Sequence, residues 1–286
     1  MSNSSTKTLA LKPLPSAKPV SHPNLQIVFS EAPCTTIQES SIDFPILQAV
    51  YFFAGDRRSG DIGFWLDQIC WEQGFRLEMQ EFDLLRNPAH DLSVIETQAK
   101  WISELDLYNF VICTPPCSGH SRIQWANKYG PHPVRSAMWP RGFPWLSRVD
   151  RKRAAINDNL IDFTWKVFKK IDVLKQTRPV IAFGEHPEDL GRVRSAGPGA
   201  VPASIWRAEE FLSLIKNGWW SGAFRQDAFG APTAKPTRGI ASCACFNTLA
   251  QHALPEFDAQ GFYNGPVTKS DSVSYTHLTL PTNREV

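Results

Sequence analysis

Short runs of apolar, β-favouring residues recur along the chain, and each ends at a glycine, a proline or an acidic residue. Runs of this length and composition predict buried strands. The predicted strands cover residues 46–55, 75–82, 108–114 and 179–187, with a very short one near His90 to Leu92. Two further strands, at residues 224–229 and 239–246, are expected to form an antiparallel pair that closes the sheet.

The segments between these strands have apolar residues at spacings of three and four, which is the pattern of amphipathic helices. The predicted helices cover residues 60–73, 93–105, 149–175 and 203–216, with Ser93 as an N-cap. In the first helix, Ile62, Trp65, Leu66 and Ile69 share one face. Strands that alternate with helices predict an α/β protein with a doubly wound, mostly parallel sheet.

The ends of the chain differ in composition from this α/β domain, which we place at residues 45–250. Residues 1–44 are rich in Ser, Lys, Pro and Thr, and they predict a disordered basic arm. Residues 251–271 have no clear pattern. Ser272 to Thr282 resembles a translated sequencing adapter, so residues 272–286 are treated as an artefact tail and left out of the fold prediction.

Composition excludes several classes of protein. Six cysteines in 286 residues, without a Cys-x-x-Cys pair, indicate neither a disulfide framework nor a zinc site. His120 and His132 lack ligand spacing, so we expect no metal and interpret them as loop or phosphate contacts. The chain has neither a membrane-spanning apolar run nor a secretory signal. We therefore expect an intracellular protein without a membrane partner, and interpret Cys243 and Cys245 as structural residues along the last strand.

Two of the predicted strands place reactive side chains at their carboxyl ends. Pro115 and Pro116 cannot donate to a sheet ladder, so they end the strand just before Cys117. Glu185 lies at the end of another strand, which Pro187 stops. Ligands and catalytic groups collect at this edge of open α/β sheets. A thiol whose pKa is lowered by basic neighbours, beside a partly desolvated carboxyl, indicates nucleophile-plus-acid chemistry.

Residues 118–148 form a long loop that is both basic and aromatic. Between Ser118 and Arg153 the sequence has eight Lys or Arg residues and one acid, Asp150, although the net charge of the chain is only +2. Arginines suit phosphates and aromatic rings suit bases, so this segment predicts a nucleic-acid surface. The interleaved aromatic residues are Trp125, Trp139, Phe143 and Trp145.

The segment from Phe53 to Asp61 joins a strand to a helix through glycines, as at the start of a Rossmann-like unit. Helix N-terminal amides at such a turn can receive a cofactor, and Asp83 after the next strand can accept hydrogen bonds from a ribose. The turn is not Gly-x-Gly-x-x-Gly, which disfavours a nicotinamide cofactor.

Four segments of the chain together resemble the motifs of the DNA cytosine-5 methyltransferases. Thr114-Pro-Pro-Cys-Ser118 resembles the Pro-Cys catalytic motif, and Phe53-Ala-Gly55 is similar to the S-adenosylmethionine-binding motif. Glu185-His-Pro187 stands in place of Glu-Asn-(Val/Pro). Gly230-Ala-Pro232 with Lys235 and Arg238 resembles the Gln-x-Arg-x-Arg segment after Gly-x-Pro. The motifs occur in the same order, over residues 48–246.

The sequence departs from the family pattern at several positions. Asp56 to Ser59 is an insertion in the first motif, and His186 replaces Asn. Thr233 replaces Gln, Thr237 replaces Arg, and no target-recognition domain is recognisable. The departures indicate a divergent branch, of the kind expected in a phage or a mobile element.

The resemblance implies a Rossmann-like class I S-adenosylmethionine-dependent methyltransferase fold. It also implies that Cys117 attacks C6 of a flipped cytosine, that Glu185 contacts N3, and that Arg122 contacts the base or its phosphate. The implied cofactor contacts are Phe53, Ala54, Gly55, Gly60, Asp61, Asp83, Asp91, Leu92 and Pro115. The implied nucleic-acid contacts are Ser118, Ser121, Arg122, Lys128, Arg135, Arg141, Lys235 and Arg238.

The expected partner is double-stranded DNA, bound by a monomer in the cytoplasm of a bacterium or phage host, or in a eukaryotic nucleus. Two alternatives stay open. One is a catalytically silent nucleic-acid-binding protein of the same fold, and the other is a cytosine methyltransferase acting on RNA.

Overall fold

The structure is a computed structural model that describes residues 44–57, 60–126, 131–194, 200–229, 231, 234–251 and 254–265. Almost all of the predicted basic arm and all of the predicted tail lie outside the described residues. The same holds for Lys128 and for three positions of the last motif, Gly230, Pro232 and Thr233.

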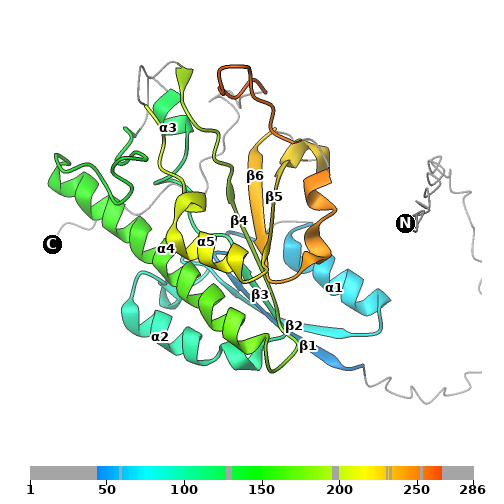
Figure 1. The fold of residues 1–286 in the computed structure, drawn as a ribbon. Helices are drawn as coiled ribbons and strands as arrows, with labels where there is room; N and C mark the ends of the chain where they lie inside the picture. Colours follow the sequence, from blue (N-terminus) through cyan, green and yellow to red (C-terminus); the bar gives the residue numbers. More distant parts are fainter. Residues whose placement is uncertain are drawn as a thin grey trace, which may run out of the picture. The chain divides into compact units, whose positions relative to one another are not determined.

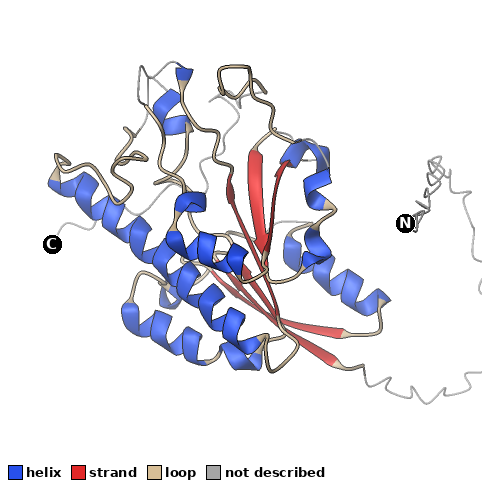
Figure 2. Ribbon diagram, viewed as in Figure 1, coloured by secondary structure: helices blue, strands red, loops and turns tan. Residues whose placement is uncertain are grey.

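The described residues form an α/β domain around one six-stranded mixed sheet of order β2-β1-β3-β4-β6-β5 (Figure 2). β2, β1, β3 and β4 pair in parallel, whereas β6 is antiparallel to both of its neighbours. Five strands therefore run in one direction and β6 in the other. The strands are β1 (Ile46–Phe52), β2 (Arg76–Phe82), β3 (Phe110–Cys113), β4 (Ile181–Pro187), β5 (Trp220–Arg225) and β6 (Pro236–Ala241).

The helices are α1 (Ile62–Glu72), α2 (Ile95–Ser103), α3 (Ile123–Ala126), α4 (Arg148–Leu174) and α5 (Glu209–Lys216). Four of them agree with those expected from the periodicity: α1, α2 and α5 are shorter than expected, and α4 begins and ends one residue earlier. The short helix α3 lies in the segment that was expected to be a loop. Helix α4 lies against one face of the sheet, with α2 and α5 beside it (Figure 1). Its buried Phe163 contacts Phe52 of β1 edge to face, with ring centroids 5.2 Å apart. Burial of this apolar stripe is the main packing contribution of the helix to the core.

Three details of the sequence interpretation were wrong. The segment near His90 is not a strand but a 3₁₀ turn (Pro88–His90), because Asn87 accepts a hydrogen bond from the amide of Ala89 and Pro88 cannot donate to a sheet. The helix after it has Val94 rather than Ser93 as its N-cap. The closing antiparallel pair is present but begins earlier, and the segments 226–229 and 244–246 are 3₁₀ turns.

The apolar face of α1 is exposed. Ile62, Trp65 and Ile69 are 39%, 52% and 51% exposed, and Cys70 is the buried residue of the helix. The physical reason is the position of the helix in the sheet, since α1 contacts β2 and β2 is an edge strand. The helix therefore overhangs the edge rather than covering the centre of the sheet.

Candidate functional site

The order of the strands places a topological switch point between β1 and β3. The chain passes from β1 to β2 on one side and then returns to β3 on the other side. The loops that leave the carboxyl ends of β1 and β3 therefore run in opposite directions. Ligands of open α/β sheets bind where two neighbouring loops diverge in this way. The turn after β1, the acid after β2 and the Pro-Cys segment after β3 all lie at this edge.

The turn after β1 is held in an unusual backbone conformation. Phe53 has a φ of 65°, in the left-handed region that a bulky residue rarely adopts, and Gly55 follows with a φ of 69°. The hydroxyl of Thr114 donates to the carbonyl of Phe53 at 2.9 Å, which ties the turn to the end of β3. Such strain persists only where neighbouring contacts enforce it, and it clusters at functional sites.

The amides of this turn are already occupied. Gly55 N–H donates to the Asp83 carboxylate at 2.8 Å, and Ala54 N–H donates to the carbonyl of Phe82 at 3.1 Å. A phosphate-binding turn needs free amides, so the turn does not suit a dinucleotide. Asp83 has spare acceptor capacity, because each carboxylate oxygen can accept two hydrogen bonds. The carboxylate therefore keeps acceptor positions for further donors, such as the hydroxyl groups of a ribose.

The other expected cofactor residues follow β1, β2 and β3 in the sequence. Gly60 has a φ of 71°, and Asp61 caps α1 by accepting from the amide of Phe64 at 2.9 Å. The Asp91 carboxylate accepts from the amide of Ser93 at 2.8 Å. Leu92 and Pro115 are buried.

Cys117 lies four residues beyond β3, on a segment fixed by α4. The side-chain amide of Asn157 donates to the carbonyl of Pro116 at 2.9 Å, and the amide of His120 donates to the carbonyl of Cys117 at 3.0 Å. The residue is half-buried, whereas the other free thiols of the described residues, Cys70 and Cys113, are buried. Cys117 is therefore the accessible thiol among these three.

Burial raises the pKa of the Cys117 thiol. The ammonium of Lys235 acts in the opposite direction and the carboxylate of Glu185 adds to the increase. The expectation of a lowered pKa was therefore wrong for the thiol in this structure. A basic group is present, as expected, but desolvation outweighs it.

Glu185 accepts hydrogen bonds from three side chains at a single oxygen. Gln226, Lys235 and Thr237 donate to its Oε1 at 3.3, 3.2 and 3.3 Å. Among the described residues, no hydrogen bond ends on Oε2. Burial disfavours the charge on Lys235, but Glu185 and Cys117 outweigh burial and raise the pKa of the ammonium. A thiol, a carboxyl group and an ammonium group thus lie together.

The register of β4 and β6 assigns the side chains to opposite faces of the sheet. Glu185 pairs with Gly239 and His186 pairs with Arg238, and successive strand residues alternate between faces. Lys235 and Thr237 meet Glu185 on one face. On the other, Arg238 donates to Oε1 of Glu188 at 3.1 Å and lines an open groove of about 400 Å³ with Trp206 and Phe211.

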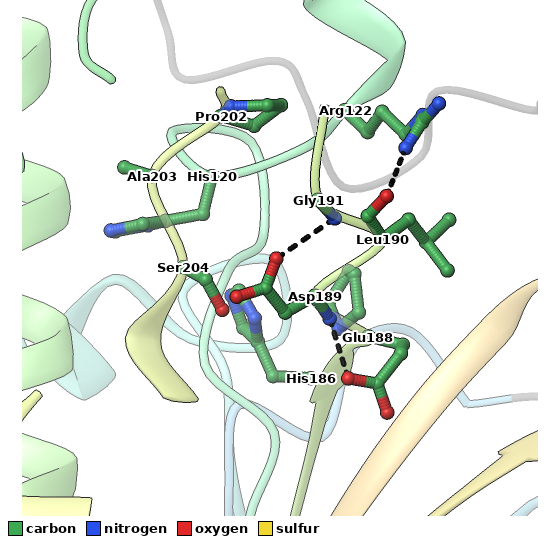
Figure 3. Close-up of a pocket in the computed structure, with 11 residues that line it drawn as sticks. His120, Arg122, His186, Glu188, Asp189, Leu190, Gly191, Pro202, Ala203 and Ser204 are labelled. Carbon is green, nitrogen blue, oxygen red and sulfur yellow. Dashed lines mark hydrogen bonds between the residues drawn. The ribbon is translucent and has the colours of Figure 1, made fainter. Parts of the chain in front are cut away.

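His186 and His120 border a small cavity behind this edge (Figure 3). Burial and the charge of Lys235 lower the pKa of His186 to about 3, and burial together with Arg135 holds the pKa of His120 well below its usual range. The cavity of about 10 Å³ approaches the size of one water molecule and is far too small for a cofactor. Arg122 donates to the carbonyl of Leu190 at 2.6 Å beside it.

The arginines of the long loop differ in position. Arg135 is 2% exposed and donates to Asp158 and to the carbonyls of Pro140 and Ala154, so it holds the loop on α4. Arg141 is exposed and pairs with Asp162 at 2.8 Å.

The two serines near Cys117 face the start of α3. Ser118 accepts from Gln124 through its carbonyl, and the Ser121 hydroxyl accepts from the amide of Ile123 at 3.4 Å. Both are half-buried. The structure thus brings Lys235 to Cys117, and directs Arg122, Arg135 and Arg238 into contacts within the protein.

The sequence interpretation missed Gln226 and Thr237 as neighbours of Glu185. The predicted antiparallel pair could have indicated them, but its register could not be read from the pattern. It also placed Cys243 and Cys245 along a strand, whereas they lie beyond β6 and are joined by a disulfide.

Within the described ranges, no helix is both long and apolar enough to cross a membrane, and no three His, Cys, Asp or Glu residues gather as a metal site. Comparison of the sequence with models of known protein families, and with curated proteins, found no match.

Proposed function

We propose that this protein is an S-adenosylmethionine-dependent methyltransferase that modifies C5 of cytosine in DNA. The observation that supports this best is the meeting of Cys117, Glu185 and Lys235 at the carboxyl edge of the sheet, on the same edge as the turn after β1. These residues come from three separated segments of the chain. We also infer that the sheet is the class I methyltransferase variant of a Rossmann-like fold, with its cofactor at the switch point between β1 and β3.

Each residue of the site has a separate role in the proposed reaction. Addition of the Cys117 sulfur to C6 moves an electron pair of the ring toward N3, and Glu185 delivers a proton to N3 through Oε2. Lys235 then stabilises the carboxylate that this transfer leaves, through its contact with Oε1. S-adenosylmethionine, when bound, supplies the methyl group that C5 accepts. The C5 proton is then lost to solvent water and the N3 proton returns to Glu185. The electron pair of the C5–H bond re-forms the C5–C6 double bond, and the C6–S bond breaks with its electron pair leaving on the Cys117 thiolate.

The thiol must lose its proton before it attacks. Its raised pKa keeps it protonated at rest, and Lys235 is the cation in place to stabilise the thiolate once substrate fills the site. A target base must leave a duplex to reach the sulfur.

A catalytically silent nucleic-acid-binding protein is the second candidate. The observations that favour it are the raised pKa of Cys117 and the position of Arg238, which faces away from the thiol toward Glu188. Binding of DNA without methyl transfer, by a folded sample that also binds the cofactor, would support this candidate.

The decisive experiment is incubation with 5-fluorocytosine DNA and S-adenosylmethionine, followed by a denaturing gel and mass spectrometry. Fluorine at C5 prevents the final loss of a proton, so a working site stays covalently attached to the DNA. We expect an adduct that maps to Cys117, is lost in Cys117→Ala and persists in the control Cys70→Ala. Absence of an adduct with DNA would refute the proposal, and an adduct with RNA alone would replace it with the RNA enzyme.

A further inference from the structure

Four aromatic rings form a continuous track over the long loop, which we call the aromatic track. Trp125 of α3 lies 6.4 Å from Phe143, and Phe143 stacks on Trp145 at 5.0 Å with an interplanar angle of 9°. Trp145 in turn meets Trp139 edge to face at 6.4 Å. The track therefore begins on α3, the helix that follows Cys117, passes Trp145 two residues before the N-cap of α4, and ends at Trp139.

The outer end of the track is exposed. Trp145 is 71% exposed and Trp139 is 41% exposed, with Met138 and Val149 beside them in the sequence at 80% and 73%. Burying large aromatic surface is favourable, so rings this open on a folded domain mark an interaction site more often than a structural one. The parallel stack of Phe143 on Trp145 occupies one face of the indole ring.

The charged side chains around the exposed end of the aromatic track indicate the class of partner. Arg148, Arg151 and Lys152 are exposed in the first turns of α4, directly after Trp145 in the sequence. Their single acidic neighbour in this segment, Asp150, already bonds to Ser147 and to Arg153. Exposed rings beside cations that form no ion pair with the described residues fit a polyanion that also offers flat apolar faces, which describes unpaired nucleic acid.

The position of the track relative to Cys117 follows from α4. Asn157 holds the carbonyl of Pro116, whereas Arg148 begins the helix nine residues earlier. At 1.5 Å of rise per residue, the two ends are about 13 Å apart. The start of α4 and the end of β3 are also well separated in Figure 1. A spacing of this size corresponds to about four stacked nucleotides.

We propose that the aromatic track binds unpaired bases of the DNA strand that flanks the target cytosine, at about four nucleotides from the base at Cys117. The inference rests on the proposed function for the identity of the target, but the binding itself needs no methyl transfer. The preferred ligand is therefore single-stranded, or a duplex with an unpaired flank, rather than an uninterrupted duplex.

The test measures binding of a fluorescein-labelled 15-nucleotide oligo-dT by fluorescence anisotropy at fixed salt, in a Cys117→Ala background without cofactor. Each lost base stack weakens binding by about fivefold or more. We expect the Trp139→Ala/Trp145→Ala pair to weaken binding at least about 25-fold, and Trp145→Phe to retain most of it. The control is Trp71→Ala, an equally exposed tryptophan on α1 (67%), which should bind as the parent does.

The same variants are then measured with a blunt duplex and with vesicles of anionic lipid. A loss confined to oligo-dT supports the inference. Equal losses with oligo-dT and the duplex, unchanged binding of oligo-dT by the double variant, or a loss with vesicles alone would each overturn it. Because the background cannot form the covalent adduct, failure of the track and failure of the methyltransferase proposal remain distinguishable. If a Trp139→Ala/Trp145→Ala protein with intact Cys117 still transfers methyl groups, the proposed function holds independently of the aromatic track.

Discussion

Replacement of Arg135 by methionine tests whether this residue supports the loop or contacts nucleic acid. The guanidinium group is almost completely buried and is bonded to Asp158 and to the carbonyls of Pro140 and Ala154. Methionine preserves much of the side-chain volume but leaves a partly buried carboxylate and two carbonyls without their donor. The loss of one member of a buried ion pair costs about 3–5 kcal/mol.

The lower end of that range applies here, because the Asp158 side chain retains 16% of its exposure to solvent. About 3 kcal/mol corresponds to a decrease in Tm of about 6–12 °C for a domain of this size. The control is Arg141→Met, which removes a similar link between the loop and α4. The side chains of Arg141 and Asp162 are 61% and 39% exposed, so the expected cost of Arg141→Met is below about 1 kcal/mol.

Thermal and urea unfolding, followed by circular dichroism, measure both variants. Adding Asp158→Asn to Arg135→Met should restore part of the loss, because it removes the unpaired charge. The effect of Arg135→Met should also shrink as the pH falls. Burial already raises the pKa of Asp158, so the penalty for its ionised form is present above that pKa and disappears on protonation. Equal melting temperatures for Arg135→Met and Arg141→Met would refute the reasoning.

Three further predictions concern the site. Alkylation of Cys117 by iodoacetamide should be slow at neutral pH. The pH profile of the alkylation rate should move to lower pH in Glu185→Gln and to higher pH in Lys235→Met. Shifts of both variants in the same direction would contradict the assigned charges. Asp83→Asn should weaken S-adenosylmethionine binding about tenfold in calorimetry, because a charged acceptor is lost, and unchanged affinity would place the ribose elsewhere. Gly184→Ala should lower the free energy of unfolding by about 1–3 kcal/mol in a urea titration, because its added Cβ would lie 2.6 Å from Cζ of Phe168; an unchanged midpoint would show that the ring moves aside freely.

The sequence predicted the elements that carry the site better than the contacts within it. Proline chemistry was sufficient to end β3 just before Cys117, and helical periodicity was sufficient to find α4. The meeting of Thr237 with Glu185 depends on the register of β4 and β6, and register is set by the packing of both strands rather than by either sequence alone. The burial of individual side chains could not be predicted from the sequence pattern either. Arg135 looks like any other loop arginine until its partners on α4 are known, and the desolvation that raises the pKa of Cys117 comes from the whole assembled edge.

The reversed strand β6 determines when the site can form during synthesis. β6 lies inside the sheet, between β4 and β5, although it is the last strand in the sequence. A nascent chain that ends before Pro236 has β3 and β4 but no partner for β5 and no Thr237 beside Glu185. About 120 residues separate Cys117 from Lys235, which ribosomes add in about 6–24 s. During that interval the thiol exists without the ammonium group of Lys235 and the hydroxyl of Thr237, so a ribosome that stalls before Lys235 releases a fragment that carries Cys117 and Glu185 but not the assembled site.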